Sequence, residues 1–116
     1  MITLYGKPQI ASDSEKPIIN DYTKKVSVVH SATYYGWIND ILKQLNQKYV
    51  FLIDKPTNVT YTFYLPKKET PKRLLECCND ISKCLIQRKV FKGCAVIIPK
   101  IKQIITGEKS KVEIEL

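Results

Sequence analysis

Residues 59–65 carry the clearest hydrophobic pattern of the chain, because apolar side chains alternate strictly with the residues between them. The first set is Val59, Tyr61, Phe63 and Leu65, and the second is Thr60, Thr62 and Tyr64. A repeat of two is the period of a β-strand, and β-branched and aromatic residues suit a half-buried pleated surface. Pro66 then removes a backbone donor, which ends the run. The sequence therefore predicts a strand at residues 59–65 with the first set in the core.

Two other segments repeat their apolar residues every three or four positions, which is the spacing of a helix that buries one face. Residues 34–47 form the first, with Trp37 on the apolar face and a hydroxyl of Ser31 or Thr33 as the N-cap. Residues 71–82 form the second, where Thr70 offers the N-cap and Pro71 suits the first helical position. The residues expected to be buried on the second helix are Leu74, Leu75, Cys78 and Ile81.

Shorter apolar runs predict the remaining strands. Residues 25–30 are rich in valine, and residues 49–53 are apolar throughout, which is typical of a strand covered on both faces. Residues 85–90 and 94–98 predict a terminal hairpin that turns at residues 91–93, where Gly93 accepts a positive φ. The order of elements over residues 25–100 is then β-α-β-β-α-β-β. This order predicts a small α+β domain with two helices packed on short sheets.

The two ends of the chain have weaker patterns. A candidate short strand at residues 2–5 is followed by glycine, proline, serine and aspartate, which indicate irregular chain to residue 22. Residues 101–116 alternate in two stretches around a polar turn, which predicts a further hairpin or the start of a following domain. We therefore divide the chain into an arm or linker at 1–22, the α+β domain at 23–100, and a β tail or next-domain start at 101–116.

The chain has 116 residues, the size of one domain, and a net charge of +8 at neutral pH. A basic balance favours contact with nucleic acid, anionic lipid or an acidic protein, and it equally describes a soluble surface with scattered lysines. No stretch approaches the roughly 20 apolar residues of a membrane-spanning helix. Residues 1–6 are not followed by the apolar core of a signal peptide, so we expect a cytosolic chain or a mature segment of an exported protein.

The four cysteines and the single histidine decide whether the sequence predicts a reactive centre. No CxxC pair occurs, so the ligand spacing of a zinc site is missing. Cys77 and Cys78 are neighbours on the second helix, whereas Cys84 and Cys94 would start strands at opposite ends of the predicted hairpin. We therefore expect four reduced thiols. The spacing places no nucleophile beside His30, so we predict no enzymatic activity, no metal and no cofactor.

The order of elements resembles the short N-terminal domain that secretins share with signalling TonB-dependent outer-membrane receptors. The resemblance covers roughly two-thirds of the chain. It rests on residues 37–42 with Leu45, residues 50–54, the alternating strand at 59–65, Thr70 with Leu74 and Leu75, and residues 93–98.

The resemblance implies a non-catalytic protein-interaction module in a bacterial envelope assembly for secretion, pilus formation or signalling. Its partner would be another envelope protein or further copies of the chain in a ring, bound through sheet edges or side-by-side packing. The chain would then be periplasmic or otherwise associated with the envelope, and cytoplasmic if the resemblance does not hold. The alternative, from a different class, is a small basic nucleic-acid-binding protein of viral or plasmid origin.

Two groups of basic residues are candidates for partner binding. The first group is Lys67, Lys68, Lys72 and Arg73, and the second group is Arg88, Lys89 and Lys92. Lys72 and Arg73 fall in the first turn of the second helix, where the helix dipole disfavours a cation by roughly 0.3–1 kcal/mol. Such a cost without an evident local gain is typical of a functional surface and also of a solvated turn. Nearby aromatic residues would suit stacking with single-stranded nucleic acid, but two of them, Tyr61 and Phe63, belong to the predicted core face.

Overall fold

The computed structural model describes residues 2–10, 16–19, 22–29, 31–45, 50–93 and 96–116. Its elements, in chain order, are β1 (Ile2–Tyr5), β2 (Lys16–Ile19), β3 (Val26–Val29), α2 (Ala32–Gln44), β4 (Phe51–Leu52), β5 (Thr57–Leu65), α3 (Pro71–Gln87), β6 (Phe91–Lys92), β7 (Ile97–Ile105) and β8 (Lys111–Glu115). The fold is α+β, which confirms the predicted fold class.

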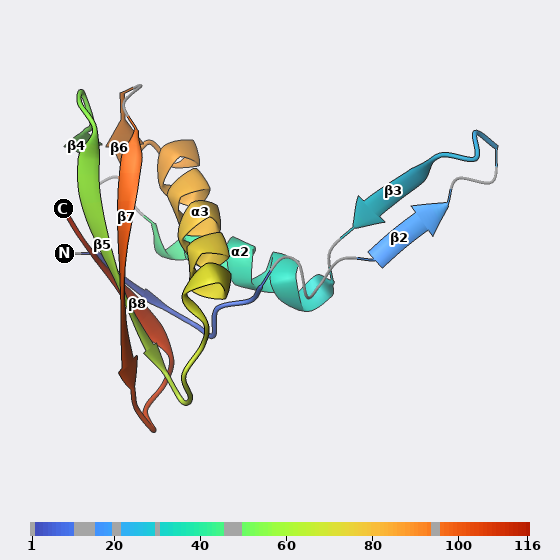
Figure 1. Ribbon diagram of the computed structural model, residues 1–116. Coiled ribbons are helices and arrows are strands. Elements are labelled where there is room, and N and C mark those ends of the chain that lie inside the picture. The colour runs from blue at the N-terminus through green and yellow to red at the C-terminus, as the bar shows by residue number, and fades with distance from the viewer. Residues whose placement is uncertain (1, 11–15, 20–21, 30, 46–49, 94–95) are drawn as a thin grey trace.

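A four-stranded sheet in the order β1-β8-β5-β7, called the central sheet, forms one layer of the molecule (Figure 1). The predicted strand lies within β5, which pairs in parallel with β7 and antiparallel with β8. Val59, Tyr61 and Phe63 are fully buried, so the prediction of an inward face is confirmed. The strand is central because its alternating apolar side chains can be covered on one face while its backbone is paired on both sides.

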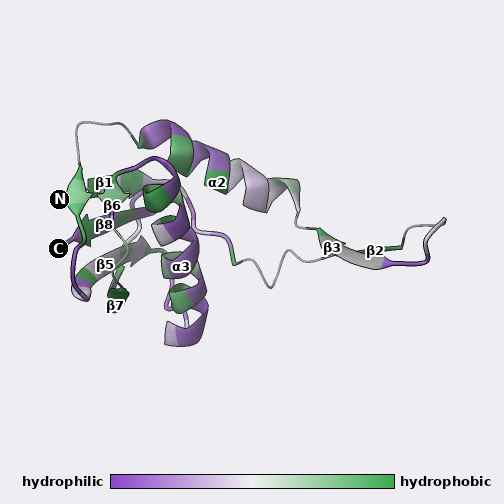
Figure 2. Ribbon diagram, turned by 90° about the horizontal axis from the view of Figure 1, so that it is seen from above, coloured by the Kyte–Doolittle hydropathy of each residue, from purple (hydrophilic) through white to green (hydrophobic). Residues whose placement is uncertain are grey.

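Both helices lie on the same face of this sheet (Figures 1 and 2). Ser31 caps α2 by accepting a hydrogen bond from the Tyr34 N–H, and Trp37 is buried on its apolar face. Thr70 caps α3 by accepting from the Arg73 N–H, and Pro71 begins the helix. The predicted start of α3 is confirmed, and of the two caps predicted for the first helix the structure uses Ser31, so α2 begins two residues before the predicted position. Leu75, expected in the core, is 40% exposed.

The prediction of a strand at residues 85–90 is wrong, because α3 continues to Gln87. The helix ends in a Schellman motif, in which the Val90 N–H donates to the Leu85 carbonyl and the Lys89 N–H to the Ile86 carbonyl. Lys89 takes the left-handed position, with a φ of 59°, where glycine is usual. Without that glycine the sequence carries no clear stop signal, and the apolar residues after Ser82 resemble a strand.

The predicted hairpin around residues 91–93 is also wrong. Of the strand predicted at residues 49–53, the described residues form only β4, which pairs in parallel with β6. Leu52 in β4 is 70% exposed rather than covered on both faces. Gly93 does take the predicted positive φ, of 115°, and a Cβ at this position would also lie 2.2 Å from the Ile53 carbonyl oxygen. Residues 94 and 95 lie outside the described residues, and the next strand, β7, runs parallel to β5 instead of returning along β6.

The division into arm, domain and tail is corrected by the sheet itself. β1 confirms the candidate strand near the N-terminus, but its Ile2 and Leu4 are core residues rather than part of a linker. β7 and β8 contain the two alternating stretches of the supposed tail, and β5 lies between them, so they form no hairpin. Residues from both ends of the chain therefore complete the sheet around β5.

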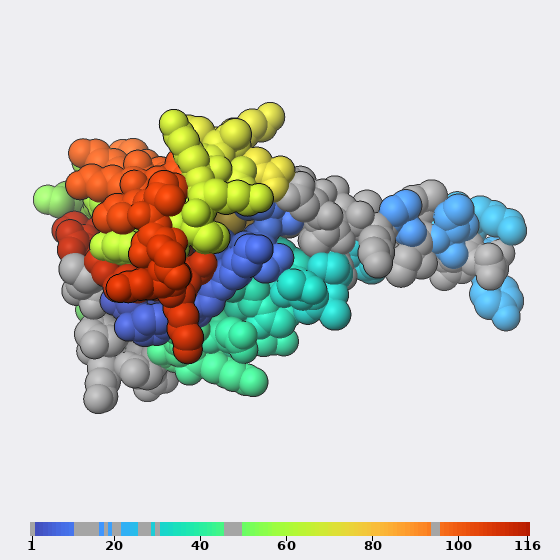
Figure 3. All heavy atoms as spheres, turned by 90° about the horizontal axis from the view of Figure 1, so that it is seen from below, coloured from blue at the N-terminus to red at the C-terminus, as the bar shows by residue number. Residues whose placement is uncertain are grey.

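The strand predicted at residues 25–30 forms β3, but it lies outside the central sheet. It pairs antiparallel with β2, in the segment expected to be irregular. Figure 3 shows that this hairpin projects from the body of the molecule. His30 lies outside the described residues.

Candidate interaction surface

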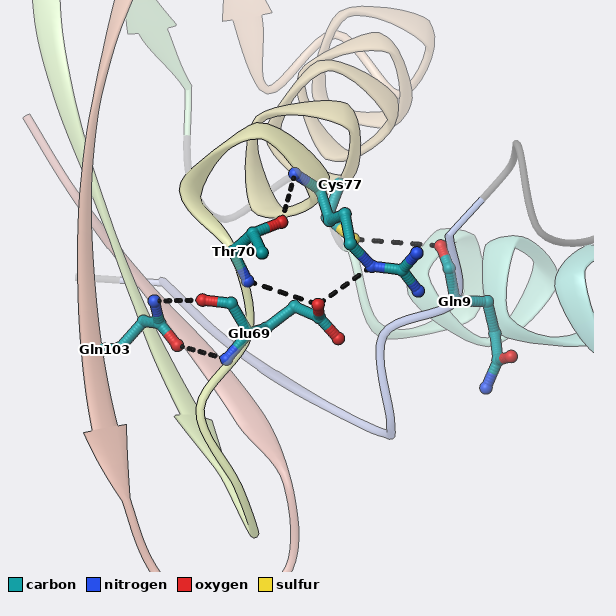
Figure 4. A network of polar contacts seen from close by, with 6 residues as sticks. Gln9, Glu69, Thr70, Cys77 and Gln103 are labelled. Carbon is teal, nitrogen blue, oxygen red and sulfur yellow. Dashed lines mark hydrogen bonds and ion pairs between the residues drawn. The ribbon is translucent and has the colours of Figure 1, made fainter.

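The first basic group surrounds the N-terminus of α3. Lys67, Lys68 and Lys72 are exposed there, whereas Arg73 is half-buried and its Nε lies 2.8 Å from the Glu69 Oε1. Gln103 on β7 fixes Glu69 by accepting from its N–H at 2.9 Å and donating to its carbonyl at 2.7 Å (Figure 4). The Glu69 carboxylate also accepts from the Thr70 N–H at 3.2 Å. The Glu69 carboxylate, fixed at the helix N-terminus, therefore offsets the charge of the basic residues there. The sequence alone showed no compensation for that charge.

The second basic group lies at the other end of α3. Arg88 and Lys89 follow its last turn and Lys92 is in β6, and all three are exposed. Cations at this end are favoured by the helix dipole, which supplies a structural reason for them. A helix of this length spans about 25 Å, at about 1.5 Å per residue. The structure therefore places the two predicted groups at opposite ends of one helix and does not bring them together.

The thiols lie inside the core. Cys77, Cys78 and Cys84 are buried and free, as expected, although Cys84 belongs to α3 and not to a strand. Burial raises the pKa of Cys77 and of Cys78 to about 12. At neutral pH both thiols are therefore protonated, and a protonated thiol is a poor nucleophile. The expectation for Cys94 falls outside the described residues.

A buried hydrogen-bond chain links α3 to the central strand. The Ser82 hydroxyl donates to the Cys78 carbonyl at 2.8 Å, so the Tyr61 hydroxyl is the donor in its own contact with Ser82 Oγ. Burial raises the pKa of Tyr61 to about 12. This phenol acts as a structural donor that joins β5 to the helix.

Over the described ranges, no group of three or more histidine, cysteine, aspartate or glutamate residues could hold a metal ion. In the same part of the chain, neither helix is long and apolar enough to cross a bilayer.

The face of the sheet opposite the helices is open and holds charged and aromatic side chains in cross-strand rows. One row joins Tyr5, Lys111, Tyr64 and Ile104. The next row joins Thr3, Glu113, Thr62 and Lys102. Within these rows Lys111 lies over the Tyr64 ring, 4.7 Å from its centroid, and its Nζ is 3.3 Å from a Glu113 oxygen. The centre of the open face is therefore occupied by contacts within the chain.

The edge strand β7 differs from that centre. Lys100 and Lys102 project from it onto the open face, one strand removed from the carboxylates of β8 because β5 intervenes. Strands are about 4.8 Å apart, so roughly 10 Å separate these lysines from the backbone of β8. Ile98 and Ile104 flank the two lysines along the same face of β7 and are 45% and 44% exposed. The edge thus presents a basic centre between two exposed apolar residues.

The backbone of β7 is also available for pairing. In a parallel ladder, residues that turn their N–H and C=O toward the neighbour alternate with residues that turn both away. The Thr57 N–H donates to the Val96 carbonyl, and the Thr106 N–H donates to the Leu65 carbonyl, which sets the phase. Even-numbered residues of β7 therefore bond to β5 and odd-numbered residues turn outward. Among the described residues, no strand pairs with that outer edge.

A groove runs beside this edge on the helix side. It has a volume of ≈ 340 Å³, and its lining is Ile86, Asn79, Ser82 and Lys83 on α3 with Ile97 and Pro99 on β7. Ile86 is itself more than half exposed. An added strand would therefore meet the apolar surface of Ile86, Ile97 and Pro99 on one face, with polar residues of α3 beside it, and lysines on the other.

These features define the chain as a small α+β domain with an open, basic edge strand. Neither Lys100 and Lys102 nor the β7 edge was predicted as a site from the sequence. The signal that could have found it is the segment 97–105 itself, in which Pro99, Lys100 and Lys102 interrupt an isoleucine-rich strand, as is usual for exposed edges. In comparisons with known proteins, no family model matches the chain and no curated protein matches it.

Proposed function

We propose that the chain is a non-catalytic protein-interaction module of a bacterial envelope assembly, similar in role to the N-terminal domain of secretins. It would bind a protein partner through the outer edge of β7. The observation that carries the proposal is this nine-residue edge, which has outward backbone groups and a groove beside it that Ile86, Ile97 and Pro99 line in part. An open edge is a template for a further strand, and main-chain hydrogen bonds then supply affinity.

The charges of the open face favour protein over nucleic acid as the partner. Glu113 and Glu115 lie on the inner strand β8, where they would repel phosphates that bind across the sheet. The two basic groups predicted from the sequence lie about 25 Å apart along α3, at about 1.5 Å per residue, so they form no single phosphate track. The net charge then comes from basic residues scattered over the surface, and only those of β7 would contribute to partner binding.

Site-specific photo-crosslinking in cells of the source organism tests the proposal. A photoreactive residue in place of Ile104, on the exposed edge, should yield protein adducts that fractionate with the cell envelope. The same residue in place of Lys43, which is exposed on α2, is the matched control and should yield few adducts. Nucleic-acid adducts at position 104, or no protein adduct there, would refute the proposed interaction. Adducts confined to cytosolic proteins would refute its envelope placement.

The nucleic-acid alternative has a separate test. Fluorescence anisotropy with single- and double-stranded oligonucleotides at about 150 mM salt, where the Debye length is about 8 Å, should show weak binding. Submicromolar binding that is abolished by reversing Lys67 and Lys68 to glutamate would favour the alternative, because phosphate contacts depend strongly on salt and charge.

A further inference from the structure

The central sheet has two edges, and they are unequal. β1 offers four residues at one edge, whereas β7 offers nine at the other. A longer edge can form more main-chain hydrogen bonds with an added strand. Of the two edges, that of β7 is therefore the one that can bind a partner strand through more main-chain hydrogen bonds.

Pro99 divides the outer edge of β7 into two parts. It is an odd-numbered residue, so its position turns outward, and proline has no N–H to donate there. C-terminal to Pro99, the residues Ile101, Gln103 and Ile105 each turn one N–H and one C=O away from β5. These three residues can form consecutive hydrogen bonds with an extended segment, and the Pro99 position can only accept.

The side chains around this edge specify the residue types of the segment. Residues paired opposite Lys100 and Lys102 would project onto the open face, beside two ammonium groups. Residues paired opposite Pro99 and Ile101 would project toward α3, over the groove that Ile86 lines. Because successive residues of a strand point to opposite faces, acidic and apolar residues must alternate to satisfy both surroundings.

We infer, building on the proposed function, that the outer edge of β7 binds an extended segment of another protein in which acidic and apolar residues alternate. A second copy of β7 suits this edge poorly, since pairing two such strands gathers four lysines on one small face. Nucleic acid suits it poorly because the outward groups of Ile101, Gln103 and Ile105 form a strand ladder rather than a phosphate cradle. The same alternation occurs in the chain's own β8, Val112-Glu113-Ile114-Glu115, which is accommodated on the other side of β5.

Amide exchange of the full, isotope-labelled chain tests this inference with a defined probe. The probe is a capped nine-residue peptide that alternates glutamate with valine or isoleucine. At nine-tenths saturation, exchange at Ile101, Gln103 and Ile105 should slow by about tenfold, because only the unbound tenth exchanges. Exchange at Lys100, Lys102 and Ile104 should change little, because their amides already bond to β5.

Two control peptides separate pairing from charge. One has the same composition with the glutamates gathered at one end, and the other has lysine in place of glutamate. Both should bind at least about tenfold more weakly, since they lose the match with Lys100 and Lys102 and, for the first, with the groove. Equal protection by all three peptides would overturn the inference about residue types, but it would support strand addition at β7 and so leave the proposed function standing.

Charge reversal completes the test. The variant Lys100→Glu/Lys102→Glu should weaken the acidic peptide by about tenfold and bind the lysine peptide better than the native chain does. The matched control Lys67→Glu/Lys68→Glu removes the same charge from an exposed loop and should leave affinity for the acidic peptide nearly unchanged. An unchanged affinity in the first variant contradicts the inference. So does the absence of edge protection with every peptide, or protection produced by a single-stranded oligonucleotide instead.

Discussion

β5 and β7 are two strands of equal length whose surroundings differ. Both contain nine residues, and they pair in parallel from Thr57 opposite Ile97 to Leu65 opposite Ile105. β5 is paired on both sides and its inward residues are buried, whereas β7 is paired on one side and its inward residues are only half-buried. The two strands have equal length and similar β propensity, yet one lies in the core and the other at the surface. The difference shows that neighbours, rather than propensity, decide what a strand buries.

The outward faces of the two strands differ in the same sense. β5 places Asn58, Thr60, Thr62 and Tyr64 on the open face, and β7 places isoleucines and lysines there. Lysine and proline on an edge strand discourage pairing with identical strands. β5 is therefore paired on both sides, whereas the free side of β7 discourages identical strands and leaves pairing to other partners.

The largest contrast is expected between paired residues on the inward face. Phe63 and Gln103 lie opposite each other in the parallel ladder. Phe63→Ala should lower the free energy of unfolding by about 3–5 kcal/mol, because it empties a fully buried site. Gln103→Ala should cost about 1 kcal/mol, since it removes hydrogen bonds to the Glu69 backbone. Urea denaturation measures both, and equal costs would contradict the assignment of β7 to the edge.

Proline substitutions at neighbouring positions should reveal the phase of β7. Ile104→Pro removes an N–H that bonds to β5 and leaves a carbonyl unpaired, which should cost about 1–3 kcal/mol. Ile105→Pro removes an outward N–H from an exposed residue and should change stability by only about 0.5 kcal/mol. Thermal unfolding of the two variants is the measurement. The reverse order would mean that the odd-numbered residues, and not the even-numbered ones, face β5.

A smaller effect concerns the groups buried behind β5. Because burial raises the pKa of Cys77 and Cys78 to about 12, the folded chain keeps these protons at pH values where the unfolded chain loses them. The folded state then binds more protons than the unfolded state, so stability falls as pH rises above the ordinary thiol range. Between pH 8 and pH 9 the two thiols together should lower the free energy of unfolding by about 1 kcal/mol.

The double variant Cys77→Ala/Cys78→Ala is the control for this pH dependence. It should be less stable at every pH, because it opens space in the core, but its stability should fall less steeply over the same interval. Denaturant titrations at several pH values give the slope. Equal slopes in the native chain and the variant would show that other groups cause the alkaline loss.

The sequence by itself determined the elements whose signals are local. The period-two alternation specified β5 and its inward face, because a strand turns successive side chains to opposite sides wherever it lies. The side chain of Thr70, with Pro71, specified where α3 begins, and the hydroxyls of Ser31 and Thr33 limited the start of α2 to two positions, because a cap needs only its own helix turn. The apolar spacing around Trp37 likewise specified which side of α2 is buried.

Only the tertiary structure decided which strands meet and where α3 ends. The end of α3 depends on Lys89 in a left-handed conformation, which a lysine adopts only when packing of a residue such as Val90 supports it. The pairing of β7 and β8 on opposite sides of β5 depends on contacts between residues far apart in the chain. The open edge follows from that strand order, because among the described residues β7 has a neighbouring strand on one side only. Lys100 and Lys102 were therefore visible in the sequence as two charges in a strand, and the fold made them the basic centre of a surface.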